Sequence, residues 1–275
     1  MAETVRLPLE GKRIVITRAA LQGEVLAKEL FARGAIPILL PLVEFADPVD
    51  FAPLDAAIGR IEQFDWMIFT SAQAVRSVVA RGKNLRRSLH QAGSKLRIAA
   101  VGPATAEAIR QAGLLVEFVA NTQNGVGLAN ELGERLGERK VLLPRGDRAN
   151  PDLPAALKRH NAQVTEVIAY RTLRPSEVDK QNLDRIVDGE ADAVLFFSPS
   201  AVQHFVELFG VEHLRSLQDS VAITAVGPVT AAALLQADVR RIVVAPDTTA
   251  ASVLQELEKH FAHTVKQLPA GAKQG

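Results

Sequence analysis

The sequence predicts an α/β fold that is built twice within one chain of 275 residues. Three observations lead to this fold class: a repeat that spans half of the chain, an alternation of β-branched runs with helix-forming stretches, and matched residues at the ends of the expected helices. With 48 % hydrophobic residues, a chain of this length has enough material for two cores. We therefore expect two α/β domains related by duplication.

The repeat is clearest in AVGPATAEAI, residues 100–109, and AVGPVTAAAL, residues 225–234. Upstream, MIFTSAQAV matches VLFFSPSAV, with Ser198 following Ser71 by 127 positions, and KRIVITR matches RKVLLPR at the same spacing. Downstream, VANTQNGVGLANEL pairs with VAPDTTAASVLQEL at a spacing of 125 positions. Because the spacing changes by so little, the duplication covers a whole half of the chain.

Each half alternates short apolar runs with helix-forming stretches, a pattern typical of parallel strands joined by crossover helices. Five strands are expected in each half. They are Arg13–Thr17, Ile36–Leu40, Trp66–Phe69, Arg97–Val101 and Leu115–Val119, followed by Val141–Leu143, Val164–Val167, Ala193–Phe197, Val221–Val226 and Ile242–Ala245.

The ends of the expected helices match as well. One helix ends at Gly34 and its counterpart at Asn161, and another ends at Gly113 with its counterpart near Asp238. Gly, Asn and Asp are the residues that best tolerate the left-handed conformation after a helix. The substitutions therefore preserve the backbone, and the repeat is structural.

Composition excludes several classes of function. The chain has no cysteine, which rules out disulfides, thiolate zinc sites and a thiol nucleophile. A formal net charge of +1 argues against nucleic-acid binding. Neither an apolar run of 18 residues nor a signal peptide occurs, which predicts a soluble cytoplasmic protein without membrane contact. No metal site is expected from the six histidines, and Gly125-Val126-Gly127 lacks the context of a dinucleotide fingerprint.

Ligands of open parallel sheets bind at the carboxyl ends of the strands, where helices present unpaired N–H groups. Gly102-Pro103 and Gly227-Pro228 lie at such points, followed by Thr105 and Thr230, which either cap their helices or contact a ligand. Further small polar groups follow two other strands: Thr70, Ser71 and Gln73, and Ser198, Pro199 and Ser200. Two such edges would bind a large polyanion, although helix capping alone is the commoner role for these residue types.

The ordered set of these motifs resembles the uroporphyrinogen-III synthase family. The set comprises TSAQAV, VGPATA, the Arg145-Gly146 turn, VIAYRT, FFSPSAV and AVGPVTA, and it extends from about Lys12 to about Phe261. TSAQAV departs from the commoner Thr-Ser-Pro pattern of the family, which the second copy keeps as SPSAV.

The resemblance implies two flavodoxin-like parallel-sheet lobes joined by a two-stranded β ladder. One lobe would be discontinuous, with residues 1–40 and 175–263, and the other would span residues 47–167. Residues 41–46 and 168–174 would form the ladder, and residues 264–275 are expected to be a disordered tail.

The resemblance also implies a function, the cyclisation of linear hydroxymethylbilane to uroporphyrinogen III with inversion of ring D and loss of water. This lyase reaction serves haem, sirohaem and cobalamin biosynthesis and needs no cofactor or metal. Expected partners are the substrate, handed over by hydroxymethylbilane synthase, and no nucleic acid or membrane. We expect a monomer.

Tyr170, the only tyrosine, matches the family's ladder tyrosine and is the expected general acid, with a packing aromatic as the alternative. The expected substrate-binding residues are Thr17, Arg18, Ser71, Gly102, Thr105, Arg145, Gly146, Ser198, Ser200, Gly227 and Thr230. Arg148 and Arg171 could also steer carboxylates, although solvated surface arginines are commoner.

Two other functions fit a duplicated α/β chain. One is a non-catalytic bilobed protein that binds a small molecule and returns it unchanged. The other is a two-lobed transferase that uses a nucleotide sugar, for which no acidic metal-binding pair is visible. Ring inversion of hydroxymethylbilane separates the first alternative from catalysis, and nucleotide titration tests the second.

Overall fold

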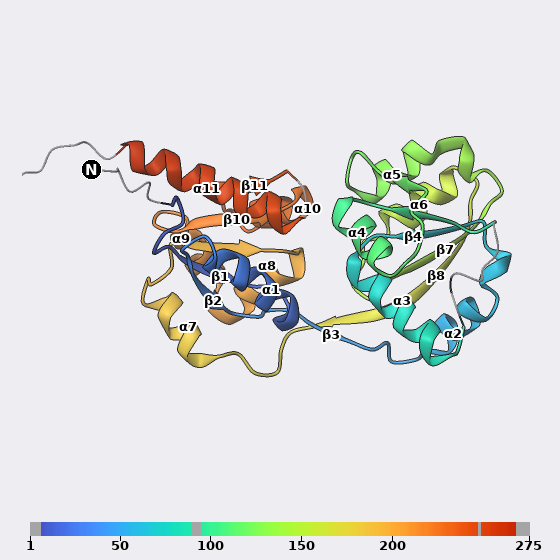
Figure 1. The fold of residues 1–275 in the computed structure, drawn as a ribbon, viewed down its shortest axis with the longest axis horizontal. Helices are drawn as coiled ribbons and strands as arrows, with labels where there is room; N and C mark the ends of the chain where they lie inside the picture. Colours follow the sequence, from blue (N-terminus) through green and yellow to red (C-terminus); the bar gives the residue numbers. More distant parts are fainter. Residues whose placement is uncertain (1–6, 88, 90–94, 247–248, 268–275) are drawn as a thin grey trace, which may run out of the picture. The chain divides into compact units, whose positions relative to one another are not determined.

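The structure, a computed structural model, describes residues 7–87, 89, 95–246 and 249–267. The chain forms two compact units, Met1–Glu44 with Arg174–Gly275, and Phe45–Leu173. Figure 1 shows the discontinuous first unit in blue at its N-terminal part and in orange to red at its C-terminal part, with the contiguous second unit in cyan to yellow-green. Both boundaries fall within the segments that the sequence assigned to the ladder.

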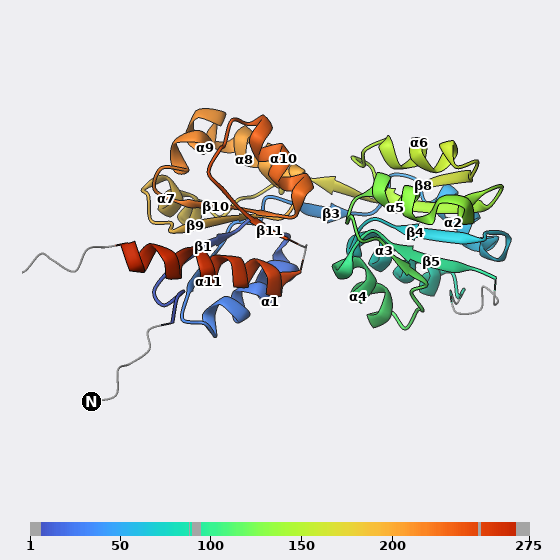
Figure 2. The same ribbon diagram turned by 90° about the horizontal axis from the view of Figure 1, so that it is seen from above.

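The first unit contains a five-stranded sheet with the order β11-β10-β9-β1-β2, and its paired strands are parallel. In Figure 2, α1 and α11 lie on one side of this sheet and α8, α9 and α10 on the other. Its elements are β1 (Arg13–Ile16), α1 (Ala20–Phe31), β2 (Ile36–Leu39), α7 (Lys180–Val187), β9 (Ala193–Phe196), α8 (Pro199–Phe209), α9 (Val211–Leu217), β10 (Ala222–Val226), α10 (Pro228–Gln236), β11 (Ile242–Ala245) and α11 (Ala250–Gln267).

The second unit contains a six-stranded sheet with the order β3-β8-β7-β4-β5-β6, parallel from β8 to β6. Its elements are β3 (Glu44–Ala46), α2 (Ala52–Gly59), η1 (Ile61–Gln63), β4 (Trp66–Phe69), α3 (Ala72–Asn84), β5 (Arg97–Ala100), α4 (Pro103–Gln111), β6 (Phe118–Val119), α5 (Gly125–Leu132), η3 (Gly133–Leu136), β7 (Lys140–Gly146), α6 (Asp152–Arg159) and β8 (Gln163–Leu173).

The two sheets have the same order once the repeat is applied. The repeat pairs β1 with β7, β2 with β8, β9 with β4, β10 with β5 and β11 with β6. The order β2-β1-β9-β10-β11 then becomes β8-β7-β4-β5-β6, which is the observed order of the second unit. The first unit has the flavodoxin order by chain position, so the predicted class of two parallel-sheet α/β lobes is confirmed.

Side chains alternate between two buried faces in the central strands. In β4, Met67 and Phe69 pack with α2, α3 and α4, whereas Trp66 and Ile68 pack with α5 and α6. All four residues of this strand are buried, as expected for a parallel strand covered by helices on both faces. Strand β4 is therefore apolar throughout, and the polar residue Ser71 follows its end.

The predicted left-handed residues at the helix ends are confirmed. Gly34 has a φ of 81° and its counterpart Asn161 has 61°, while Gly113 has 78° and Asp238 has 66°. The repeat therefore preserves these turns although the residue type changes.

Strand β8 is longer than predicted, and its counterpart is interrupted. β8 runs without a break through Gln163–Leu173, whereas the matching segment, residues 36–46, forms β2 and β3 with a gap at Leu40–Val43. Pro41 lies in that gap and cannot donate a main-chain hydrogen bond, which favours a break there. β3 pairs beside β8 in the second sheet, and a role for these segments as the link between lobes stays a prediction.

Three other elements differ clearly from the sequence prediction. Strand β7, expected at Val141–Leu143, extends from Lys140 to Gly146. The strand expected at Leu115–Val119 is limited to Phe118–Val119, because Leu115 is 89 % exposed and only the last two residues pair with β5. Helix α11 continues to Gln267, into the segment expected to be a tail from residue 264. Residues 268–275 lie outside the described part of the chain.

Among the residues that the structure describes, no helix has the length and apolar character required to span a bilayer.

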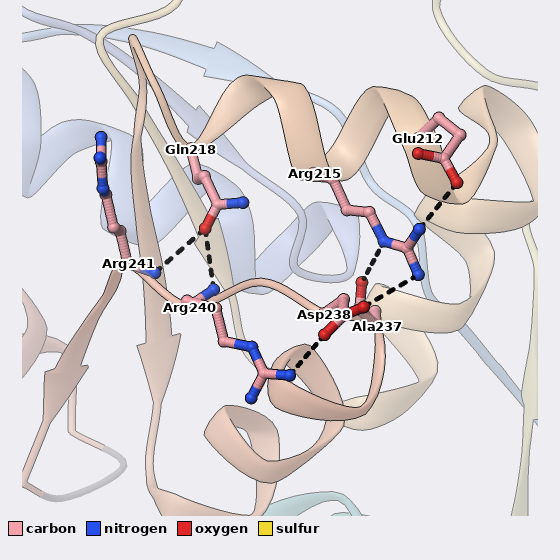
Figure 3. A network of polar contacts seen from close by, with 7 residues as sticks. All are labelled: Glu212, Arg215, Gln218, Ala237, Asp238, Arg240 and Arg241. Carbon is pink, nitrogen blue, oxygen red and sulfur yellow. Dashed lines mark hydrogen bonds and ion pairs between the residues drawn. The ribbon is translucent and has the colours of Figure 1, made fainter.

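A polar network holds the start of β11 at the amino end of the first sheet (Figure 3). Gln218 Oε1 accepts from the backbone N–H groups of Arg240, at 2.8 Å, and Arg241, at 3.1 Å. Arg215 bridges Glu212 and Asp238, at 2.7 and 3.4 Å. These contacts join α9 to the α10–β11 connection at the amino end of the sheet, away from the carboxyl ends of its strands.

Candidate functional site

The change of direction in the strand order locates a candidate site in each unit. Ligands of doubly wound sheets bind at the carboxyl ends of the two strands where the order reverses. In the second unit these strands are β4 and β7, and in the first unit they are β1 and β9. Ser71 follows β4, and Arg145 and Gly146 end β7, so three of the predicted residues lie at one switch point.

Tyr170 joins them from the neighbouring strand β8. Its hydroxyl oxygen lies 3.1 Å from Ser71 Oγ, and Ser71 Oγ also accepts from the backbone N–H of Ala74 at 3.1 Å. Ser71 is the N-cap of α3, as its position after a strand predicted. Either hydroxyl can be the donor in the Ser71–Tyr170 pair. When Ser71 donates, the phenol proton is available to another acceptor.

A register shift and a glycine place the Tyr170 ring. Arg145 pairs with Ile168 but Gly146 pairs with Tyr170, so β8 bulges by one residue at Ala169. A Cβ atom on Gly146 would lie 2.8 Å from Tyr170 Cζ, which is closer than atoms pack. Phe45 of β3 meets the other side of the ring edge-on, with centroids 5.4 Å apart. Only glycine fits beside the ring at this position.

Burial raises the pKa of Tyr170 above its usual value near 10. The nearby Asp147 carboxylate adds to this rise, whereas the Ser71 hydrogen bond and the charges of Arg76 and Arg145 lower the pKa in part. The net effect keeps the phenol protonated at neutral pH, and a protonated phenol is a hydrogen-bond donor.

Arg145 is buried at the end of β7 and holds the following loop. Its Nη1 donates to Glu166 at 2.8 Å, and its Nη2 donates to the carbonyl of Asn150. The Asp147 N–H donates to the Tyr170 carbonyl at 3.2 Å, and Asp147 Oδ1 accepts from the Thr172 N–H at 2.9 Å. These contacts fix the loop after β7 in place beside Tyr170. Arg145 therefore influences Tyr170 by holding this loop.

Thr105 and Thr230 do not cap their helices. The N-caps of α4 and α10 are Gly102 and Gly227, and neither helix has a side-chain cap. Both threonine side chains are buried, at 5 % and 3 % exposure, in the first turn of the helix. The sequence favoured helix capping as the role of these two threonines. That prediction is wrong, because a glycine three residues earlier is the N-cap of each helix.

The predicted residues of the first unit lie at its own carboxyl edge. Thr17 Oγ1 donates to the Leu195 carbonyl at 2.7 Å, so its buried hydroxyl joins β1 to β9. Arg18 donates to Gln22 at 2.6 Å and lies over Phe197. Ser198 caps α8 by accepting from the Ala201 N–H at 3.2 Å. Ser200 lies in the first turn of α8, and Gly227 begins α10 with a φ of 85°.

The helix starts at both edges suit anions. The first N–H groups of a helix have no partner within it, and the helix dipole makes this end positive. Four helices begin directly after strands at these edges, namely α3, α4, α8 and α10. Within the described residues, no group of three or more His, Asp or Glu side chains is arranged to hold a metal ion.

Sequence reasoning missed three residues: two that contact Tyr170 and one that caps α5. Asp147 follows Arg145-Gly146 directly, and its position after a strand was a usable signal. Asn124 caps α5 by accepting from the Gly127 N–H at 2.8 Å, a pattern typical of helix starts. Phe45 gave no signal, because its contact with Tyr170 depends on the pairing of β3 with β8. Arg171, named as a possible carboxylate ligand, donates to the Asp47 carbonyl at 2.8 Å.

The chain is similar to proteins of one family over most of its length. A family model described as uroporphyrinogen-III synthase HemD matches residues 24–255. A uroporphyrinogen-III synthase of Synechococcus elongatus is 31 % identical over 228 residues, covering 81 % of this chain and 85 % of that relative. A putative uroporphyrinogen-III synthase of Methanothermobacter thermautotrophicus is 32 % identical over 222 residues, covering 79 % and 86 %.

Solved structures show the same fold. A mutant uroporphyrinogen III synthase from Thermus thermophilus aligns over 92 % of this chain and 100 % of that chain, with a TM-score of 0.63 and 23 % identity. A uroporphyrinogen-III synthetase from Helicobacter pylori aligns over 92 % and 99 %, with a TM-score of 0.58 and 17 % identity.

Proposed function

The chain belongs to the uroporphyrinogen-III synthase family, and we propose that it carries out the reaction of that family with Tyr170 as proton donor at the switch point of the second unit. Its activity is that of a uroporphyrinogen-III synthase, a hydro-lyase of tetrapyrrole biosynthesis. The substrate of this family is hydroxymethylbilane, which loses water and closes with inversion of ring D.

The first chemical step is the loss of the terminal hydroxyl. The C–O bond breaks, and the oxygen takes the electron pair and a proton from the Tyr170 phenol and leaves as water. The methylene carbon and its pyrrole become a cationic azafulvene. The substituted α-carbon of ring D attacks this methylene to form a spirocycle. The bond from that carbon to the methylene linking rings C and D then breaks, and this linking methylene bonds to the other α-carbon of ring D. The proton lost at that closure returns to the phenol.

One observation carries the role of Tyr170: its hydroxyl lies 3.1 Å from a serine that already accepts a backbone N–H. We assign Ser71 as the donor in this pair, so that the phenol proton can point to the leaving hydroxyl. The raised pKa keeps this proton in place until the substrate arrives. Because the substrate is intrinsically reactive, orientation contributes more than acid strength.

We assign the carboxylates of the substrate to the carboxyl edges of both sheets. In the second unit, the N–H groups at the starts of α3 and α4 would donate to the carboxylates, beside Ser71, Gly102 and Thr105. In the first unit, the starts of α8 and α10 offer the same chemistry beside Ser198, Ser200, Gly227 and Thr230. Arg18 adds a cation after β1. Thr17 and Arg145 act through hydrogen bonds that hold the edges, and Gly146 acts through its close packing against Tyr170.

Handover from hydroxymethylbilane synthase belongs to the same proposal. The bilane closes without assistance to the type I isomer, so a short transfer path reduces the loss of substrate. A cytoplasmic monomer is also proposed. Sedimentation of the purified protein with and without hydroxymethylbilane synthase tests the oligomeric state and the handover.

The proposed function is tested by supplying freshly generated hydroxymethylbilane and separating the oxidised products into type I and type III uroporphyrin. We expect predominantly type III with the wild-type protein and type I without protein. A bilane bound tightly but recovered only as type I would instead make this chain a non-catalytic binding protein.

A further inference from the structure

A carboxylate is hydrogen-bonded to the strand that carries the proton donor, in a site that must bind a substrate rich in carboxylates. Asp147 follows β7 directly and is exposed at the carboxyl edge of the second sheet. Its N–H donates to the Tyr170 carbonyl and its Oδ1 accepts from the Thr172 N–H, so both ends of the residue are tied to β8 around Tyr170. The side chain is thus held in place and is not a freely moving surface group.

This charge opposes two requirements of the site. It repels the acetate and propionate groups of the bilane, and it disfavours the phenolate that forms when Tyr170 gives up its proton. A negative charge becomes favourable at this place, however, when a positive charge develops on the substrate close to it. The reaction produces such a charge, because departure of the hydroxyl leaves a cation shared by the methylene carbon and the pyrrole nitrogen.

We propose that Asp147 is a catalytic counter-ion that stabilises this cation and directs the hydroxymethyl end of the bilane, rather than a carboxylate-bearing edge, towards Tyr170. The inference rests on the proposed function and adds a second residue to it. Tyr170 supplies the proton that leaves with the hydroxyl as water. Asp147 takes no part in this proton transfer.

The repeat supports a functional role for Asp147. The first-unit positions that match Gly146, Asp147 and Tyr170 at the spacing of 127 are Ala19, Ala20 and Val43. Asp147 and the phenol therefore occur together in one unit and are both replaced in the other. In the described part of the chain, Oδ2 of Asp147 has no hydrogen bond or ion pair, and this oxygen remains for the substrate.

The test compares two inhibitors that differ in charge at the reacting carbon. One is the bilane with an aminomethyl end, which is an ammonium at neutral pH, and the other is the bilane with a methyl end, which is neutral. Inhibition constants are measured for the wild type, Asp147→Asn and Asp50→Asn. Asparagine keeps an oxygen that can accept from Thr172 while removing the charge. Asp50 is a matched control, an exposed carboxylate whose Oδ1 accepts the Ala52 N–H at 2.8 Å.

We expect the wild type and Asp50→Asn to prefer the ammonium inhibitor by about tenfold, and Asp147→Asn to lose this preference. The rate of type III formation should fall about tenfold in Asp147→Asn with little change in KM. An equal preference in wild type and Asp147→Asn, or an undiminished rate, would overturn the role of Asp147 while leaving the proposed function intact. A wild type that forms only type I would overturn both.

Discussion

The carboxyl edges of the two units differ at one place although their sheets share one strand order. Ser71 and Ser198 occupy matched positions, and each caps its helix through the same backbone contact. Only Ser71 also meets a phenol, because Tyr170 in β8 corresponds to Val43, which is buried in the first unit. The duplication therefore preserved the serine cap of both units, and the phenol is present in one.

The amino edges, in contrast, are alike. Asp65 Oδ2 accepts from the Lys140 N–H at 2.9 Å and lies near Lys95 and Arg139. Asp192, which follows Asp65 by 127 positions, accepts from the Arg13 N–H at 2.9 Å and lies near Lys12. Each aspartate joins the starts of two neighbouring strands. The aspartate contacts at the amino edge are thus kept in both copies, whereas the phenol at the carboxyl edge occurs in one.

Removal of the phenol should give the largest effect. Tyr170→Phe keeps the ring beside Gly146 and Phe45 but removes the donor, and we expect the rate of type III formation to fall about 100-fold. The stability of the variant, measured by thermal unfolding, should stay close to that of the wild type. An unchanged rate with an unchanged ratio of isomers would remove Tyr170 from catalysis.

Displacement of the ring should have the next largest effect. Gly146→Ala places a methyl group 2.8 Å from Tyr170 Cζ, so the ring must move, and we expect the rate to fall by about 10- to 100-fold. The matched change in the first unit, Ala19→Gly, should leave the rate unaltered because no phenol lies there. Steady-state kinetics of both variants test the comparison, and full activity of Gly146→Ala would contradict the tight contact.

The paired serines separate capping from catalysis. Ser71→Ala and Ser198→Ala should each lower the free energy of unfolding by about 1 kcal/mol, since each loses an N-cap. Only Ser71→Ala should also slow catalysis, by about tenfold, because the phenol loses the hydrogen bond that orients it. Denaturant unfolding and rate measurements on both variants are needed. Equal losses of rate would show that the two units take the same part in the chemistry.

The amino-edge aspartates should affect stability alone. Burial raises the pKa of Asp65, but the hydrogen bond from Lys140 and the ion pairs with Lys95 and Arg139 lower it more, and the pKa of Asp192 is lowered in the same way by Arg13 and Lys12. A carboxyl group with a lowered folded-state pKa contributes stability above its unfolded-state value near 4. That stability is lost as the pH falls through the folded-state pKa.

Asp65→Asn and Asp192→Asn should therefore each lose about 1 kcal/mol at neutral pH and show a flatter decline of stability below pH 4. Urea unfolding at several pH values measures both effects. Type III formation should stay at the wild-type rate, and a loss of activity in either variant would mean that the amino edge also contributes to the site.

Much of the frame could be predicted from local residues. The strand at Trp66–Phe69 and the left-handed turns at Asn161 and Asp238 follow from hydrophobic runs and turn residues, which act over a few positions. The serine caps were predictable for the same reason. The roles of Thr105 and Thr230 were not, because the choice between a threonine cap and a glycine cap depends on how the preceding strand ends.

The sequence by itself determined the α/β class, the duplication and the residues available at the strand ends, because these depend on periodicity and on short-range backbone preferences. Only the tertiary structure decided which of those residues meet. Ser71, Gly146, Asp147 and Tyr170 come from segments up to 99 positions apart, and they gather at one point because β8 pairs with β7 through a bulge and β7 pairs with β4. Strand order and register arise from packing across the whole sheet, and no local pattern encodes them.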